Sequence, residues 1–101
     1  NIPYRSSNST HVFHQYTLKT SPKYRDKLIK YLTKKEIPAM IYYPIPLYKQ
    51  EAFSRYVPEN YSIENIEKLC SSFFSLPIHS EKENSQQEKI IEAVRSFFNS
   101  I

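Results

Sequence analysis

The stretch HVFHQYTLKTSPKYRDKLIKYL, residues 11–32, decides the fold that we predict for this chain. In residues 11–20, β-branched and aromatic side chains dominate an alternating pattern, which is typical of a strand. Ser21 and Pro22 then indicate a helix start, because serine favours the cap and proline the first helical position. One face of that helix is apolar and carries Tyr24, Leu28, Tyr31 and Leu32. The pattern predicts a strand followed by an amphipathic helix that ends near Lys35.

A second strand and a second helix are predicted next. The apolar run 39–43 indicates the strand, which Pro44 and Pro46 end because proline donates no ladder hydrogen bond. The helix is expected to be capped near Asn60 or Ser62. Its apolar stripe comprises Ile63, Ile66, Leu69, Cys70 and Phe73.

The last part of the chain adds a brief strand and the strongest amphipathic helix. Residues 76–78 indicate an edge strand, where Pro77 is tolerated. Asn84 and Gln87 have the spacing of a capping box. The helix after them has a stripe of Ile90, Ile91, Val94, Phe97, Phe98 and Ile101. The element order predicts the α/β (α+β) class, with a small mixed or antiparallel sheet of about three strands and helices on one face. The other face is left for a partner, such as another domain.

Composition limits the class of protein. The chain has 101 residues, enough for one small domain, and its 40% hydrophobic and 24% charged content is ordinary for a soluble globular domain. No apolar run approaches the roughly 18 residues that cross a bilayer, so we expect no membrane contact. Residues 1–10 are a polar lead-in without the apolar segment of a signal peptide. The single cysteine, Cys70, favours a reducing compartment, and we expect a cytoplasmic protein.

Glycine and charge narrow the possible ligands. The chain has no glycine, which excludes a Rossmann fingerprint or a P-loop. The net charge is +4, and residues 1–50 hold nine Lys and Arg against two acids. These charges form either a solvated helix face or an anion-binding face. A nucleic-acid-binding module is the weaker alternative, because the strand lacks the RNP1 pattern and the cations lie mostly on a helix. We therefore expect no nucleic-acid partner.

No catalytic or metal-binding constellation stands out. In a strand His11 and His14 face opposite sides, so they could not hold one metal ion together. His14 is expected to be a hydrogen-bonded core histidine. Cys70 lies on an apolar helix stripe and is expected to be an inert packed thiol. Glu64 and Glu67 fall on an amphipathic helix, where solvation is the default.

The unusual segment is IYYPIPLYKQEAF, residues 41–53. Aromatic rings beside two prolines could line a pocket, where phenol hydroxyls hydrogen-bond phosphate or sugar oxygens. The alternative is a loop that its rings pin to the core. The candidate substrate-binding residues are Tyr42, Tyr43, Tyr48 and Phe53.

Three blocks resemble, in order, the C-terminal region of the DegT/DnrJ/StrS-type sugar aminotransferases. HVFHQYTLK at 11–19 is similar to a strand of the family. Residues 25–53 resemble the helix, the strand and the H-Y-P-x-P-L-H loop that follow it in the family. FSLPIHSE at 74–81 resembles the family's L-S-L-P-x-H-P-E block. The resemblance implies that residues 11–101 are a C-terminal small domain of a fold-type I enzyme, after the lead-in 1–10. It also implies that the large domain, with the catalytic lysine and pyridoxal 5'-phosphate (PLP), is absent here.

The resemblance further implies a function. Such enzymes are usually homodimers that move an amino group, commonly from glutamate, to the keto group of a nucleotide-linked sugar. The small domain helps to close the active site, so we expect no catalytic residue, metal or PLP on this fragment. Tyr42 and Tyr43 occupy the family's His-Tyr positions, which tend to meet the nucleotide diphosphate. Tyr48 replaces a frequent His, Phe53 a frequent Tyr, and Glu36 a frequent Gly.

A same-fold sugar dehydratase or a non-transaminating relative is the alternative within this resemblance. The lysine position that separates these enzymes lies upstream of the sequence. Reading that position is therefore the observation that decides between them.

Overall fold

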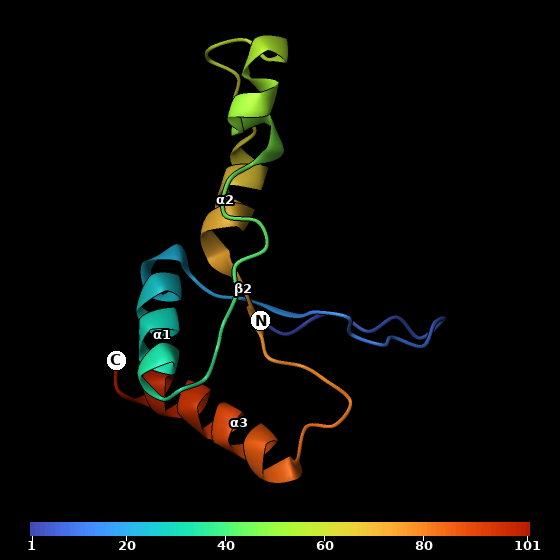
Figure 1. Ribbon diagram of the computed structural model, residues 1–101, viewed down its shortest axis with the longest axis vertical. Coiled ribbons are helices and arrows are strands. Elements are labelled where there is room, and N and C mark those ends of the chain that lie inside the picture. The colour runs from blue at the N-terminus through green and yellow to red at the C-terminus, as the bar shows by residue number, and fades with distance from the viewer.

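The computed structural model describes residues 1–101 (Figure 1). Its sheet has two antiparallel strands, β1 (Tyr16–Lys19) and β2 (Phe73–Leu76), with Tyr16 opposite Leu76 and Lys19 opposite Phe73. The third expected strand, 39–43, is reduced to a single bridge between Met40 and Ser75. The chain leaves the sheet after this bridge because the Pro44–Pro46 segment cannot continue a ladder. The sheet of about three strands was therefore wrong by one strand.

β1 is shorter than the sequence predicts, and β2 begins earlier in the chain. Residues 11–15 lie outside β1, and Phe13 has a φ of 49°, which a strand does not accommodate. His14 is consequently exposed, and the prediction of a core histidine was wrong. β2 begins at Phe73 rather than at residue 76, because β-favouring Phe73 and Phe74 pair with β1. Phe73 thus belongs to the strand and not to the preceding helix.

Three α-helices accompany the sheet. α1 spans Pro22–Lys34 after Ser21, as the sequence predicts. α2 spans Glu64–Ser72, and α3 spans Asn84–Asn99. The capping box of α3 is formed by Glu83 and Gln86, one residue earlier than expected. α2 begins later than predicted, with Ile63 in the cap position. No helix is both long and apolar enough to cross a membrane.

The core lies where α1, α3 and β2 meet. Its buried apolar side chains are Leu28, Leu32, Ile37, Phe74, Ile90, Ala93 and Phe97. Because side chains alternate along a strand, Phe74 and Leu76 face these helices while Phe73 and Ser75 face the other way. The prediction of a sheet with helices on one face holds for α1 and α3. On the opposite face, Ser75 is buried and contacts Thr17.

α1 ends in a Schellman motif without glycine. The Glu36 N–H donates to the Thr33 carbonyl and the Ile37 N–H to the Leu32 carbonyl, both at 3.0 Å. Glu36 has a φ of 60°, the left-handed conformation that favours glycine. Ile37 and Leu32 are both buried, which is the apolar contact that accompanies this motif. The burial of Ile37 therefore holds Glu36 in the left-handed conformation, which is unfavourable for a residue with a side chain.

The molecule is elongated. Its radius of gyration is 16.2 Å, whereas a compact domain of this length has about 13 Å. Figure 1 shows α2 and the green segment before it rising from the sheet, away from α1 and α3. Only ten of the 101 residues are buried, so much apolar surface stays exposed. Surface of this kind typically marks an interaction site.

Candidate functional site

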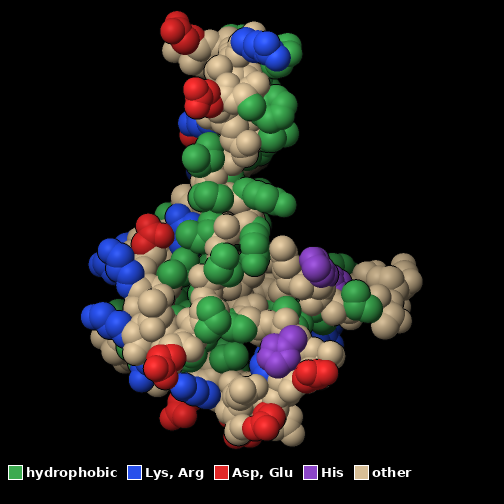
Figure 2. Space-filling model, viewed as in Figure 1, with side chains coloured by type: hydrophobic (Ala, Val, Ile, Leu, Met, Phe, Trp, Pro, Cys, Tyr) green, Lys and Arg blue, Asp and Glu red, His purple; other side chains and the backbone are tan.

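Residues 41–62 form the projection that we call the arm. It contains the short 3-10 helices η1 (Leu47–Lys49) and η2 (Glu51–Tyr56), neither of which has a buried residue. The arm starts beside the Met40–Ser75 bridge and returns to the sheet through α2, which leads directly into β2. The part of the molecule formed by α1, α3 and the sheet is called the helical half. Figure 2 shows hydrophobic side chains gathered along the arm and at its junction with the helical half. The arm is therefore an exposed apolar excursion from the sheet.

A hollow of about 590 Å³ lies between the arm and α2; we call it the aromatic hollow. The arm side is lined by Ile41, Tyr42, Tyr43, Ile45, Pro46, Leu47 and Gln50. The other side is lined by Ile66, Leu69, Cys70 and Phe73. The lining is mostly apolar, with two phenol hydroxyls and one amide. Such a lining suits a ligand with an apolar or planar part and a few polar oxygens.

The structure brings two of the four predicted site residues, Tyr42 and Tyr43, into this hollow. Tyr42 is 43% exposed and Tyr43 is 75% exposed. Neither hydroxyl has a hydrogen-bond partner within the chain, which leaves both available to a ligand. The segment itself comes from the irregular backbone between the Met40 bridge and η1. Pro44 and Pro46 restrict the backbone directly after these two residues.

Tyr48 does not line the aromatic hollow. Its hydroxyl donates to Glu67 Oε1 at 2.7 Å and accepts the Ile63 N–H at 3.0 Å. Its ring meets that of Tyr61 edge-on, with centroids 5.3 Å apart. These contacts tie η1 to the first turn of α2. Tyr48 thus holds the arm, and its hydroxyl already donates and accepts a hydrogen bond within the chain.

Glu67, which the sequence predicts to be a solvated carboxylate, instead accepts several hydrogen bonds. Its Oε1 accepts hydrogen bonds from Tyr48 and Ser62, each at 2.7 Å, and lies 2.9 Å from Lys49 Nζ. The bonds from Ser62, Lys49 and Tyr48 lower the pKa of Glu67 to about 2. The same carboxylate raises the pKa of Lys49 through their hydrogen bond. No spacing pattern could have found this cluster, because Tyr48 and Glu67 are 19 residues apart.

Phe53, the fourth predicted residue, lies on η2 and not on the lining of the hollow. It is 39% exposed. Its backbone N–H donates to the Gln50 carbonyl within the arm. Phe53 therefore belongs to the outer part of the arm, beside the candidate site.

A smaller hollow of about 230 Å³ adjoins the other side of Tyr42. His14 and His79 both line it, together with Ser75. His11, the histidine that the sequence analysis compared with His14, does not line this hollow. No three His, Cys, Asp or Glu side chains lie together in an arrangement that could hold a metal ion.

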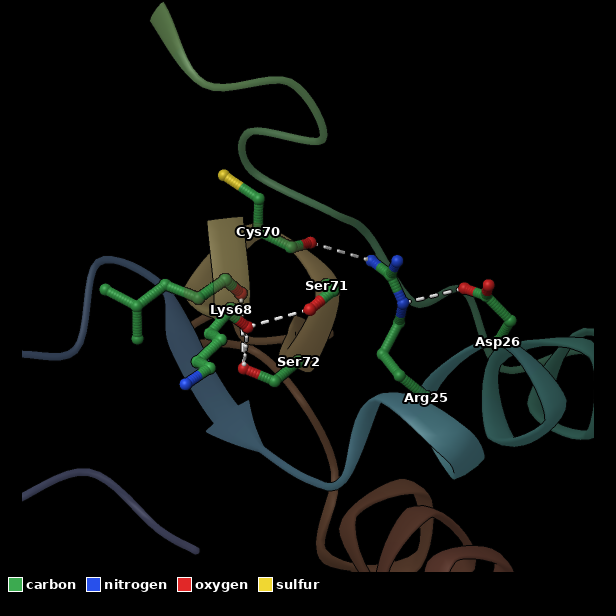
Figure 3. A network of polar contacts seen from close by, with 7 residues as sticks. Arg25, Asp26, Lys68, Cys70, Ser71 and Ser72 are labelled. Atoms are coloured by element: carbon green, nitrogen blue, oxygen red, sulfur yellow. Dashed lines mark hydrogen bonds and ion pairs between the residues drawn. The ribbon is translucent and has the colours of Figure 1, made fainter. Parts of the chain in front are cut away.

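The end of α2, through which the chain returns from the arm to the sheet, contacts α1 (Figure 3). Arg25 Nη1 donates to the Cys70 carbonyl at 3.3 Å, and Ser71 and Ser72 donate to the Lys68 carbonyl. The Cys70 carbonyl is among the last four of α2, which have no partner within the helix, so the bond from Arg25 satisfies it. Arg25 Nε also lies 2.7 Å from Asp26 Oδ1, in an ion pair whose geometry makes no hydrogen bond. The end of α2 is fixed by polar contacts.

The side chains that line the aromatic hollow show whether it could hold PLP. Cys70 is half-buried and lines the aromatic hollow, so its thiol lies at a site wall and outside the core. A PLP site needs a Schiff-base lysine, a phosphate cup and a partner for the pyridine nitrogen. The lining of the aromatic hollow contains no lysine and no carboxylate. The aromatic hollow therefore lacks the side chains that would form a Schiff base with PLP or pair with its pyridine nitrogen.

Comparison with known proteins gives a consistent picture. Residues 1–95 match a model of the DegT/DnrJ/EryC1/StrS aminotransferase family. A "pleiotropic regulatory protein" from Geobacillus stearothermophilus is 36% identical over 87% of this chain and 23% of its own length. The dTDP-3-amino-3,6-dideoxy-alpha-D-galactopyranose transaminase from Aneurinibacillus thermoaerophilus is 31% identical over 95% of this chain and 25% of its own length. The chain thus spans about a quarter of these relatives.

Solved structures agree at the level of the fold. A DegT DnrJ EryC1 StrS aminotransferase from Brucella abortus superposes with a TM-score of 0.83 at 31% identity, covering 95% of this chain and 25% of that one. S. venezuelae DesV, solved in complex with a ketimine intermediate, gives a TM-score of 0.85 at 28% identity over the same shares. The elongated shape and its arm are therefore features that this chain has in common with parts of larger proteins.

Proposed function

Because this chain belongs to the DegT/DnrJ/EryC1/StrS aminotransferase family, we propose that it is the C-terminal small domain of a PLP-dependent aminotransferase acting on a nucleotide-linked keto sugar. Relatives named as dTDP-amino-sugar transaminases match 93–95% of the chain but only a quarter of their own length, which supports this proposal. The domain comprises residues 11–101 after a lead-in of 1–10. The rest of the enzyme supplies the catalytic lysine and the PLP site.

The role of this domain is to close the active site and contact the substrate. The observation that carries it is the aromatic hollow, where Tyr42 and Tyr43 present free hydroxyls beside apolar walls. A hollow with hydrogen-bond donors but without a base or a lysine can bind and orient a sugar nucleotide and exclude water. It has no group to move the amino nitrogen. PLP supplies that chemistry when bound in the complete enzyme.

The remaining parts of the proposal concern the whole protein. Glutamate is the amino donor, the large domain of the same chain is the first partner, and the complete enzyme is a cytoplasmic homodimer. The exposed arm supports a partner beyond this domain, because a monomer seldom leaves so many large apolar side chains in solvent. Ile45, Leu47 and Tyr43 are each more than half exposed.

The test is removal of each hydroxyl in the full-length enzyme. Tyr43→Phe is expected to raise KM for a dTDP-linked keto sugar about tenfold and Tyr42→Phe by a similar factor, because a hydrogen bond to a charged group is worth about 1.5–3 kcal/mol. The matched control is Tyr56→Phe, since Tyr56 lies in the same arm, is 69% exposed and does not line the hollow. An unchanged KM in both hollow variants would contradict the proposal.

A further inference from the structure

Glu67 is the point at which the arm joins α2. Its Oε1 receives three donors: the Tyr48 and Ser62 hydroxyls, each at 2.7 Å, and the Lys49 ammonium at 2.9 Å. Tyr48 Oη in turn accepts the Ile63 N–H, one of the donors at the start of α2 that have no partner within the helix. We call this group of contacts the clasp. It closes a ring between η1, the end of the arm and the first turn of α2.

The clasp accounts for every side-chain hydrogen bond and ion pair between the arm and α2. The other polar contacts of the arm are local, such as Lys49 N–H to the Pro46 carbonyl and Ser54 Oγ to the Glu51 carbonyl. Apolar burial adds little, because within residues 41–62 only Pro46 is buried. A segment with so little burial opens readily unless specific contacts hold it. The clasp is therefore the principal restraint on the arm.

The clasp also sets the width of the aromatic hollow. One wall carries Leu47 and Gln50, which flank Tyr48 and Lys49 along the chain. The facing wall carries Ile66 and Leu69, which flank Glu67 on α2. Glu67 itself is not part of the lining. Fixing Tyr48 against Glu67 fixes the two walls relative to each other.

From this arrangement we propose that Glu67 is a positioning residue for substrate binding: it holds the arm through Tyr48, Ser62 and Lys49 and thereby keeps the aromatic hollow in the shape that accepts the nucleotide sugar. The inference rests on the proposed function for its ligand. It goes further by assigning a role to a side chain that touches no substrate. Its anionic charge matters because all three partners are donors, one of them a cation, and a carboxylate accepts from all of them.

The experiment compares Glu67→Ala, Glu67→Gln and Glu64→Gln in the full-length protein. Glu64 is the matched control, since it lies one turn earlier on α2 and pairs only with Lys68 at the surface. Hydrogen exchange measured by mass spectrometry reports on residues 47–62, and calorimetric titration with dTDP reports on the hollow. Exchange in residues 22–34 shows whether the helical half remains folded.

In Glu67→Ala we expect exchange in residues 47–62 to be at least tenfold faster and the Kd for dTDP to rise about tenfold. Glu67→Gln keeps the shape and one acceptor and should fall between wild type and Glu67→Ala. Glu64→Gln should match wild type in both measurements. With a saturating sugar nucleotide, kcat of the Glu67 variants should stay within twofold, because Glu67 acts on binding alone.

Two results would overturn the inference: exchange in 47–62 that stays within twofold of wild type, or faster exchange with an unchanged Kd for dTDP. The second result would make the clasp a stabilising contact without a role in binding. Failure of the proposed function has a different signature, because the unaltered protein would then not bind dTDP at all. If Glu67→Ala does not fold, the same two measurements on Glu67→Gln, compared with Glu64→Gln, still test the inference.

Discussion

The helical half and the arm are held together by different forces. In the helical half, α1, α3, β2 and Ile37 after α1 together contribute seven buried apolar side chains, and Leu28 and Leu32 are completely inaccessible. In the arm, η1 and η2 bury none, and a cluster of polar contacts around Glu67 does the holding. Apolar burial gives stability that does not depend on one contact, whereas a polar clasp depends on each partner. The helical half is therefore a scaffold with its own apolar core, whereas the arm has none, which supports the proposal that the arm is a binding element.

The largest expected contrast comes from one substitution made in both regions. Leu28→Ala should destabilise the chain by about 2–5 kcal/mol, because it removes a buried side chain and leaves a cavity. Leu47→Ala, at a position 63% exposed in the arm, should stay within about 0.5 kcal/mol. Urea denaturation followed by circular dichroism measures both. Equal costs would mean that the two regions form one cooperative core.

A smaller effect of opposite sign is expected at the end of α1. Glu36→Gly should stabilise the chain by about 1 kcal/mol, since glycine adopts the φ of 60° without the penalty of a side chain. Lys35→Gly is the matched control: its φ is −97°, so glycine there should be neutral or destabilising. Thermal melting would show the gain as a shift of roughly 4–8 °C. A loss of stability in Glu36→Gly would contradict the assigned strain.

The smallest expected effect is a response of the arm to acid. The pKa of Glu67 falls from its ordinary 4.5 to about 2 in the folded chain, so the fold favours the ionised carboxylate. Its contribution is complete above about pH 4.5 and is lost as the pH falls toward 2. The Ile63 amide, bonded to Tyr48 Oη, should therefore shift in NMR spectra with a midpoint near 2. Glu67→Gln should abolish this transition, and its persistence there would assign it to another group.

The sequence predicts the helical half better than the arm, for a physical reason. α1 follows from local signals, namely Ser21, Pro22 and a 3.6-residue apolar period. Local signals fail at 39–43, where β-favouring side chains line a hollow and only Met40 pairs with a strand. They fail again at Phe73, because an apolar residue continues the helical period although tertiary pairing makes it a strand.

The residues of the candidate site also differ in how well the sequence predicts their positions. Tyr42 and Tyr43 can be selected from the sequence because two prolines and neighbouring aromatic rings are adjacent along the chain. The separation of Tyr48 and Phe53 from the hollow depends on how η1 and η2 turn, which no local pattern encodes. Glu67 could not be selected, because its role arises only when residues 48 and 62 fold back onto α2.

Ser75 lies where the chain leaves the sheet to form the arm and where it returns to the sheet. Its backbone exchanges two hydrogen bonds with Met40, at 2.7 and 3.0 Å, and its hydroxyl lies 2.8 Å from that of Thr17. The excursion therefore departs beside the strand into which it finally returns, so that its two ends are neighbours. An insertion or deletion between those ends changes the reach of the projection while leaving the strand register intact. Such a joint allows the length of the projection to change with no repacking of the scaffold.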